Sequence, residues 1–312
     1  MRFLLIGIGL ACTLSAKTSV PQDKIPAGIS AEIRQEIDRL YLTTTDVVQG
    51  AGKLAAMGEK AAPSIPFLIG LFDEGSGLEC VREGDRQFCG FGLEMSAAAA
   101  ALAQIGAPAL PPLVVLARKG EKGSAEGAIM ALARMENPRA TAVLIELAGN
   151  RAYALRSTIA KELGSARSVP AADLLVRLAK DSDPAVRAGA LEGIANSKDP
   201  RAADLVVAGL ADADAKVREA AAFTLVNHPE PKAFDALVRT LSDPSDGARN
   251  GACQALGELK DKRAVKPLVG VVTGDKESLV RFQAGRALEA ITGEHFGENG
   301  GKWQKWFDRS GQ

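Results

Sequence analysis

The sequence is poor in aromatic residues, in histidine and cysteine, and in net charge. Aromatic residues make up 4% of the 312 residues, and there are two histidines and four cysteines. Two histidines, His228 and His295, exclude a metal site built from several imidazoles. Basic and acidic residues balance at 38 each. A chain without net charge has no basic field to collect phosphates, so we expect no binding to nucleic acid or to anionic membranes.

The common catalytic motifs are also missing. There is no Gly-x-Ser-x-Gly, no phosphate-cradling Gly-Lys-Ser/Thr loop, no Cys-x-x-Cys and no His-Glu-x-x-His. Aspartate and glutamate are abundant, but their spacing singles out no general acid and base. We therefore predict a protein that is not an enzyme and that holds no catalytic residue, cofactor or metal.

Apolar residues, above all alanine, are plentiful. Hydrophobic residues form 46% of the chain, charged residues 24%, and alanine alone occurs 54 times. This composition is too apolar for intrinsic disorder and too charged for a protein with many membrane spans. It indicates a folded, water-soluble protein.

The N-terminus has the pattern of a secretory signal. Arg2 precedes an apolar run over residues 3–11, and the small residues Ser15 and Ala16 come before Lys17. The run is too short to span a bilayer, so we expect no integral membrane span. Cleavage after Ala16 would release a soluble protein, which we favour. One alternative is lipidation of Cys12, which would anchor the chain; another is a buried N-terminal strand or helix.

Export changes how the cysteines are interpreted, because disulfides persist in oxidising compartments. Cys80 and Cys89 bracket a polar stretch with Gly84, and we predict a disulfide that closes this loop. Cys253 lies in an apolar helical pattern, so we predict an unreactive core thiol.

A repeat of about 31 residues is the strongest signal. An aspartate and an arginine stand six residues apart four times, and the arginines follow one another by 31, 31 and 32 residues. Arg156 lies 31 residues before the first of these arginines, with Asn150 in the aspartate position. The four pairs are Asp181 and Arg187, Asp212 and Arg218, Asp243 and Arg249, and Asp275 and Arg281. A large aliphatic residue follows each arginine by seven positions, and this frame extends back to Leu132, Leu102 and Leu54.

Each repeat contains two helical patterns joined by a turn. In one repeat, residues 172–179 and 186–194 have helical spacing and residues 181–184 form the turn. Pro184 and Pro244 suit helix starts. A single pair of short helices cannot bury both apolar faces, so we predict an all-α fold: a right-handed α-solenoid of about seven to eight stacked helical hairpins. Alanines let the helices approach closely.

These units resemble HEAT repeats, in particular the short bacterial repeats that are also found in phycobilin lyases. The resemblance rests on the turn aspartate followed by Val-Arg, as in Asp181 with Val186 and Arg187, and it covers about residues 44–292. The unit with Ala248 in the valine position departs from the pattern. The resemblance implies a helical solenoid in a bacterium, but it says little about function, because the family includes scaffolds, lyases and DNA-repair proteins.

The aspartates and arginines of the repeat have two interpretations. Each guanidinium can bind the turn aspartate of its own or of the adjacent unit in a bidentate, purely structural ladder. Alternatively, the arginines form a stripe that binds acidic peptide or phosphate. The matching aspartates favour the structural ladder.

Two departures from the repeat are candidates for partner binding or for capping. The insertion at residues 75–95 adds about 17 residues, and we expect a partner-contacting loop, a neutral insertion or a cover for the concave surface of the solenoid. Its candidate contact residues are Arg82, Arg86, Phe88 and Phe91. The segment 293–312 carries Trp303, Trp306 and Phe307 at helical spacing, and we predict that it caps the last repeat; the alternative is an aromatic site for a ligand or partner. The organisation is thus signal 1–16, flexible leader 17–29, solenoid 30–292 and cap 293–312.

The leading hypothesis is an exported, non-catalytic scaffold or adaptor that binds an unknown protein partner in the periplasm or at the cell envelope. The sequence leaves its oligomeric state open. One alternative is a tetrapyrrole-binding protein similar to bilin lyases, or another ligand-binding HEAT protein. A nucleic-acid binder similar to HEAT-like DNA glycosylases is the third possibility, and the neutral charge argues against it.

Overall fold

The computed structural model describes residues 25–72, 78–83 and 86–310, and between residues 78 and 91 it describes the backbone alone. The predicted signal and most of the predicted leader lie outside these residues. The chain divides within one helix into two compact units, Met1–Ala131 and Leu132–Gln312. Each unit is described by itself.

The first unit is built from short helices that pack in pairs. Ser30 caps the first helix, and Thr43 and Asp46 form a capping box at the start of the second. α2 packs against α4. The helices are α1 (Ala31–Arg39), α2 (Thr44–Ala56), α3 (Ile65–Gly70), α4 (Leu93–Ile105), α5 (Leu110–Lys119) and α6 (Lys122–Arg134), with 3-10 turns at Gly58–Ser64 and Ala107–Ala109.

The insertion is a β-hairpin, where the sequence predicted no strand and a loop. β1 (Leu78–Glu83) pairs antiparallel with β2 (Arg86–Phe91), and β1 contacts α2. The prediction was wrong because the stretch has no clear alternation of apolar and polar residues, and its pairing comes from a chain reversal that brings two short segments together. α4 begins at Leu93, near the end of the predicted insertion 75–95.

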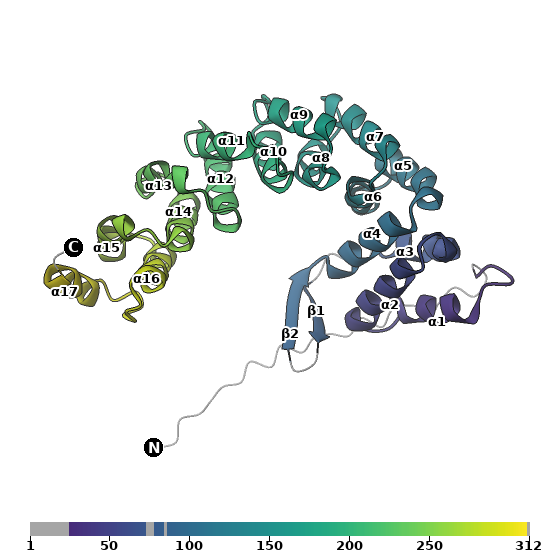
Figure 1. Ribbon diagram of the computed structural model, residues 1–312, viewed down its shortest axis with the longest axis horizontal. Coiled ribbons are helices and arrows are strands. Elements are labelled where there is room, and N and C mark those ends of the chain that lie inside the picture. The colour runs from purple at the N-terminus through teal and green to yellow at the C-terminus, as the bar shows by residue number, and fades with distance from the viewer. Residues whose placement is uncertain (1–24, 73–77, 84–85, 311–312) are drawn as a thin grey trace, which may run out of the picture. The chain divides into compact units, whose positions relative to one another are not determined.

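The second unit has two rows of helices (Figure 1). Each inner helix packs against the next inner helix, and each outer helix from α7 to α15 packs against an inner one, whereas α17 packs against α15. The outer row is α7 (Pro138–Gly149), α9 (Val169–Leu178), α11 (Ala202–Gly209), α13 (Phe234–Thr240), α15 (Val265–Gly274) and α17 (Gly300–Ser310); the inner row is α8 (Arg156–Leu163), α10 (Pro184–Asn196), α12 (Ala215–Asn227), α14 (Asp246–Leu259) and α16 (Ser278–Thr292).

Local sequence sets where the inner helices begin. Asp183 and Asp214 are the N-caps of α10 and α12, and each carboxylate accepts a hydrogen bond from the backbone N–H two residues later. Pro184 occupies the first helical position, as predicted. Pro244 does not begin a helix: Ser245 is the N-cap of α14, so Pro244 lies in the turn.

The apolar frame read from the sequence forms the centre of the core. All eight frame residues are at most 1% exposed, and each lies on a different helix of the inner type, from α2 to α16. They are Leu54, Leu102, Leu132, Leu163, Ile194, Leu225, Leu256 and Leu288. The prediction of a helical solenoid of about seven to eight stacked helical hairpins is therefore confirmed.

Small residues let neighbouring inner helices approach closely. The alanines Ala190, Ala221, Ala252 and Ala284 are fully buried. Between α8 and α10 even alanine is too large, because a Cβ on Gly193 would overlap the carbonyl oxygen of Ala160. Alanine enrichment is thus explained by packing between repeats.

Candidate functional site

The repeated aspartates and arginines form one continuous ladder along the second unit. The Nε and Nη2 atoms of Arg187 donate to the carboxylate of Asp212 in the next repeat at 2.9 and 2.7 Å. The Nη1 atom of the same arginine donates to the backbone carbonyl of Asp181 in its own repeat at 2.8 Å. Each such guanidinium therefore ties two successive turns together.

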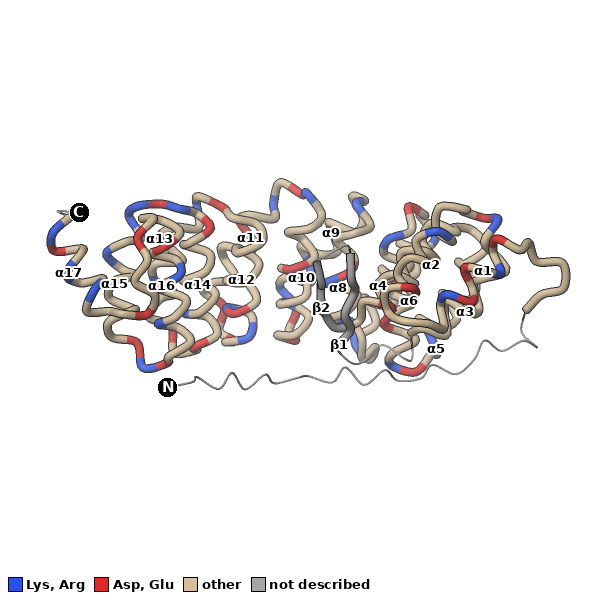
Figure 2. Tube along the Cα trace, turned by 90° about the horizontal axis from the view of Figure 1, so that it is seen from below, with Lys and Arg blue, Asp and Glu red and all other residues tan. Residues whose placement is uncertain are grey.

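The same arrangement recurs along the unit, where charged residues gather in the turns at the helix ends (Figure 2). Bidentate pairs join Arg156 to Asp181, Arg187 to Asp212, Arg218 to Asp243 and Arg249 to Asp275. Of the two geometries open at the level of sequence, the carboxylate contact is made to the adjacent repeat, and the contact within the repeat goes to a backbone carbonyl. The ladder has the geometry of the structural interpretation.

Electrostatics keep the ladder carboxylates ionised. The hydrogen bond from the arginine of the preceding repeat holds the pKa of Asp181, Asp212 and Asp243 below its usual value. For Asp275 the largest single effect is burial, which raises the pKa, but Arg249, a backbone N–H and nearby positive charge together outweigh it, so the pKa is lowered. In turn, the hydrogen bonds to Asp212, Asp243 and Asp275 raise the pKa of Arg187, Arg218 and Arg249, respectively.

The two ends of the ladder differ. At the first end, the repeat has Ala125 in the arginine position, and the matching aspartate position holds the neutral Asn150. The negative charge is thus missing from the aspartate position at the place where the arginine that would bind it is also missing. At the other end, Arg281 donates from Nη1 to the carbonyls of Asp275 and Lys276 at 2.9 and 3.1 Å, but no carboxylate of the described residues binds its Nε and Nη2.

A second row of ion pairs lies on the outer helices, and the sequence interpretation missed it. Arg201 binds Asp173 at 2.8 Å, and Lys232 binds Asp204 at 2.6 Å, across 28 residues in both cases. The signal was present: Asp173 and Asp204 are 31 residues apart, as are Arg201 and Lys232. Because these side chains are largely solvent-exposed, the pairs add little stability.

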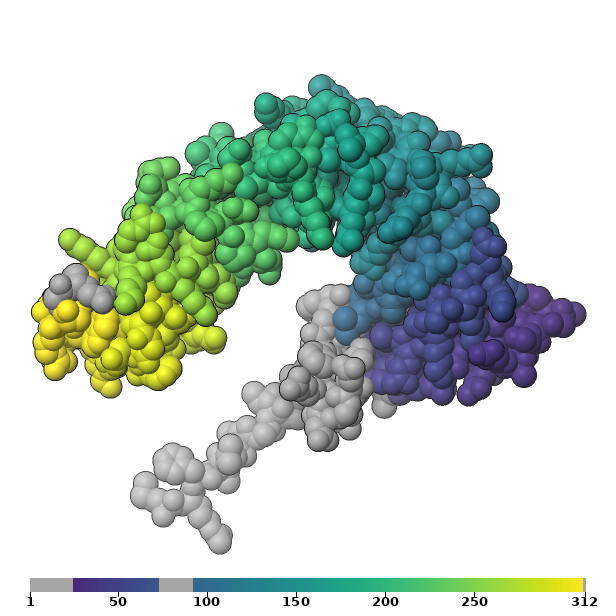
Figure 3. Space-filling model, in the orientation of Figure 1, coloured from purple at the N-terminus to yellow at the C-terminus, as the bar shows by residue number. Residues whose placement is uncertain are grey.

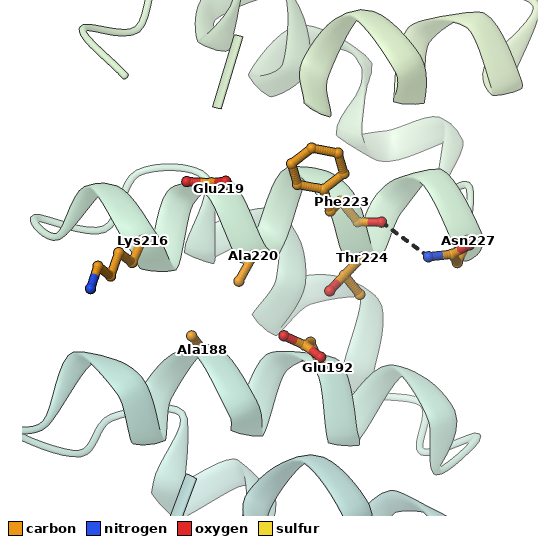
Figure 4. A pocket seen from close by; sticks show the side chains of 8 residues that line it. All are labelled: Ala188, Glu192, Lys216, Glu219, Ala220, Phe223, Thr224 and Asn227. Carbon is orange, nitrogen blue, oxygen red and sulfur yellow. Dashed lines mark hydrogen bonds between the residues drawn. The ribbon is translucent and has the colours of Figure 1, made fainter. Parts of the chain in front are cut away.

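The inner helices carry an open groove between α10 and α12, with a volume of about 540 Å³. Figure 4 shows Ala188 and Glu192 projecting from α10, and Ala220, Thr224 and Lys216 from α12. Glu219 and Phe223 also line the groove, and their side chains project from the side of α12 that faces away from α10. Phe223 is half-buried, so the rim of the groove on α12 offers an aromatic ring beside the charged Glu219.

A second groove of about 330 Å³ lies between α14 and α16 and is more polar. Gln254, Glu258, Gln283 and Arg286 line it together with alanine and glycine. Within the part of the chain that the structure describes, Glu258 and Arg286 make no ion pair, and neither do Lys216 and Glu219 at the first groove. Glu192 is different, since it binds Lys161 at 3.0 Å.

The hairpin contains the predicted insertion residues. Cys80 stands directly opposite Cys89 in the antiparallel register, and Arg82, Arg86, Phe88 and Phe91 lie in the same two strands. Their side chains, and hence a disulfide bond, lie outside what the structure describes. Cys12 lies outside the described residues altogether.

Other predicted features have definite places. Cys253 is fully buried on α14, and burial raises the pKa of its thiol to about 12. In the described ranges, no three histidine, cysteine, aspartate or glutamate side chains are grouped as metal ligands would be. No single helix of those ranges has the length and apolar character to cross a membrane. One bent pair of helices has them when the two are taken together: Leu93–Ile105 and Ala107–Lys119, which meet at an angle of 116°.

The paired helices, the repeating core and the ladder define a helical repeat protein, an α-solenoid. The family model described as HEAT repeats matches residues 150–225 and 204–289, so the repeats of this stretch are similar to HEAT repeats. No curated protein matches the sequence.

Several solved structures are similar to this chain at a low level. The YibA protein of Escherichia coli is 18% identical, with a TM-score of 0.45, over 78% of this chain and 91% of that one. A designed armadillo repeat protein in complex with the peptide (KR)4 is 20% identical, with a TM-score of 0.38, over 73% and 99% of the two chains. Human deoxyhypusine hydroxylase in complex with glycerol is 19% identical, with a TM-score of 0.35, over 84% and 98%. No function is inferred from likeness at this level.

Proposed function

We propose that this protein is a non-catalytic scaffold that binds a partner protein through the inner helices of its second unit. The binding surface is the groove between α10 and α12, with Phe223 among its lining residues, together with the more polar groove between α14 and α16. Figure 3 shows this inner side as a hollowed surface along residues 132–310.

One observation carries the proposal: the charged groups of the ladder and the outer row are used between repeats, and those of the inner grooves are mostly not. Ladder carboxylates and guanidiniums bind one another, and the outer row pairs Arg201 with Asp173. Lys216, Glu219, Glu258 and Arg286 have no such ion pair in the described part of the chain. A half-buried aromatic ring flanked by charged groups without partners has the composition of a protein-binding surface.

The experiment is affinity capture from the source cell extract with matched variants. Phe223→Ala removes the aromatic face of the first groove, and Val169→Ala removes an apolar side chain that is 74% exposed on the outer helix α9. We expect a captured protein that is lost with Phe223→Ala and retained with Val169→Ala. Binding that is equal for both variants, with thermal melts unchanged, would contradict the proposal.

We further propose that the chain is exported to the periplasm or envelope, with a disulfide between Cys80 and Cys89. The N-terminal apolar run supports export. In a hairpin with a two-residue connection, the residues that flank it, Glu83 and Arg86, form a hydrogen-bonded pair. Pair types alternate along an antiparallel ladder, so Cys80 and Cys89 form a non-hydrogen-bonded pair, the type with the shorter distance between Cα atoms. This separation suits a disulfide.

Intact mass of the purified native protein tests both points. Cleavage after Ala16 gives the mass of residues 17–312, whereas lipidation gives a chain that begins at a modified Cys12. A disulfide removes two hydrogens and leaves Cys253 as the one thiol alkylated after denaturation. A full-length mass, or three alkylated cysteines in the mature chain, would overturn export or the disulfide respectively.

The tetrapyrrole-binding alternative stays a prediction. Mixing the protein with a bilin tests it, since binding would produce a shifted visible absorption band.

A further inference from the structure

Within residues 132–310, as the structure describes them, the last inner helix α16 is only half covered. α17 takes the position of a further outer helix and packs against α15. The loop before α17 covers the second half of α16, where the carbonyl of Gly297 leaves no room for a Cβ on Gly285. In the described chain no inner helix follows α16, so the first half of that helix lacks the neighbour that every earlier inner helix of the unit has.

This uncovered half of α16 carries exposed apolar side chains. Leu279 is 56% exposed and Phe282 is 43% exposed, and they are two of five large apolar side chains that are exposed in the described residues. Earlier repeats act as an internal control. At the position of Phe282 they have Ser157, Ala188, Glu219 and Asn250, which are small or polar.

The open end of the ladder lies between these two residues in the sequence. Four preceding repeats have an arginine at the position of Arg281. Each of these arginines binds the turn aspartate of the next repeat through its Nε atom, its Nη2 atom or both. Arg281 keeps the contact to its own turn, with Nη1 2.9 Å from the Asp275 carbonyl, and so its guanidinium is already held in the orientation of the ladder. A carboxylate could enter without reorganising the protein, which lowers the cost of binding.

We propose that the uncovered half of α16 docks a helix of a partner protein whose preceding turn carries an aspartate or glutamate. The carboxylate binds the open guanidinium edge of Arg281, and the apolar face of the partner helix covers Leu279 and Phe282. The partner would thus take the place of the next inner helix. This surface is separate from the inner grooves, and its occupant is identified by charge complementarity with Arg281 and by the apolar pair beside it.

A second copy of the chain is a poorer occupant. A two-fold contact through the same face would bring Arg281 of each copy toward the other, and like charges repel. Self-association is therefore an outcome that the test must separate.

The test uses a labelled peptide of residues 212–227, measured by fluorescence anisotropy with the full-length protein. This segment carries Asp212, which in the protein binds Arg187, and it forms the helix that packs beside α10. We expect saturable binding that weakens about tenfold or more in Arg281→Gln and in Phe282→Ser. The control variant Val169→Ser, at an exposed apolar position on α9, should bind as the parent protein does.

A double-mutant cycle gives the sharper readout. An Asp212→Asn peptide should bind the parent protein about as weakly as the unchanged peptide binds Arg281→Gln, and combining both changes should cost little more. The proposal fails if the parent protein shows no saturable binding, or if the two changes weaken binding independently. It also fails if sedimentation shows self-association that Arg281→Gln abolishes, because the occupant is then a second copy.

Discussion

At the residue scale, the ladder shows how one side chain can serve two repeats. Arg218 donates to the carboxylate of Asp243 in the next repeat and to the backbone carbonyl of Asp212 in its own. Its planar fork makes this possible, because the guanidinium offers several donors in fixed directions, which a lysine ammonium does not. The pair is only about one-tenth exposed, so solvent screens it less than a surface ion pair.

Removing one partner should therefore be costly. Arg218→Met leaves Asp243 without its bidentate donor, and we expect a loss of roughly 1–3 kcal/mol in the free energy of unfolding. Urea denaturation measures it. Arg281→Met is the matched control, since it loses contacts to backbone carbonyls but leaves no carboxylate of the described residues without its donor. Its loss in the free energy of unfolding should be smaller. Equal losses would show that the carboxylate contact adds nothing.

Glycine at the α8–α10 contact is a second residue-scale device. A Cβ on Gly193 would overlap the Ala160 carbonyl, whereas Gly270 on α15 has open space around its Cβ position. We expect Gly193→Ala to destabilise the protein by about 2–4 kcal/mol through forced separation of the helices. Gly270→Ala should be neutral or slightly stabilising. Thermal unfolding of the two variants distinguishes packing from helix propensity.

At the element scale, the helices follow the sequence pattern closely, and the exceptions have physical causes. Asp183 and Pro184 start α10 through local chemistry, which a sequence shows directly. The hairpin at Leu78–Phe91 is different, because its strand pairing depends on the register of two segments and on packing against α2. Such support is a tertiary contact, and no pattern within the insertion encodes it.

The terminal helix α17 depends on one buried ring. Trp303 is fully buried, its indole N–H donates to the Gly297 carbonyl at 2.8 Å, and Phe296 packs edge-on at 4.8 Å. Trp303→Ala should cost about 3–5 kcal/mol locally and raise hydrogen exchange in α15–α17. Trp306→Ala, at a half-buried ring, should have a smaller effect. Unchanged exchange in α15 would mean that α17 does not cap the solenoid.

At the scale of the whole molecule, the ladder predicts how stability depends on pH. Asp181, Asp212, Asp243 and Asp275 each have a pKa below the usual value of 3.8. A carboxyl with a lowered folded pKa contributes stability that is complete above the unfolded pKa and is lost as pH falls through the folded one. Glu162, whose pKa burial raises, acts in the opposite direction, but it is one group against four.

We therefore expect the free energy of unfolding to be nearly flat from about pH 7 to 5 and to fall below about pH 4. Urea denaturation across this range measures it. Asp212→Asn should be less stable at neutral pH and should lose less stability on acidification, because that carboxyl no longer titrates. Glu298→Gln, at an exposed position, should follow the parent curve; if Asp212→Asn follows it too, the ladder does not set the pH dependence.

The sequence by itself determined the repeat, its period and the eight buried aliphatic residues that mark the inner helices, because periodic burial leaves a periodic pattern. It also indicated that the aspartates and arginines pair. Only the tertiary structure decided that the arginines from Arg156 to Arg249 reach the next repeat, that Arg281 meets no carboxylate there among the described residues, and that Cys80 lies opposite Cys89 in the strand register. Those facts depend on which turn lies beside which, and stacking fixes that only after the helices have packed.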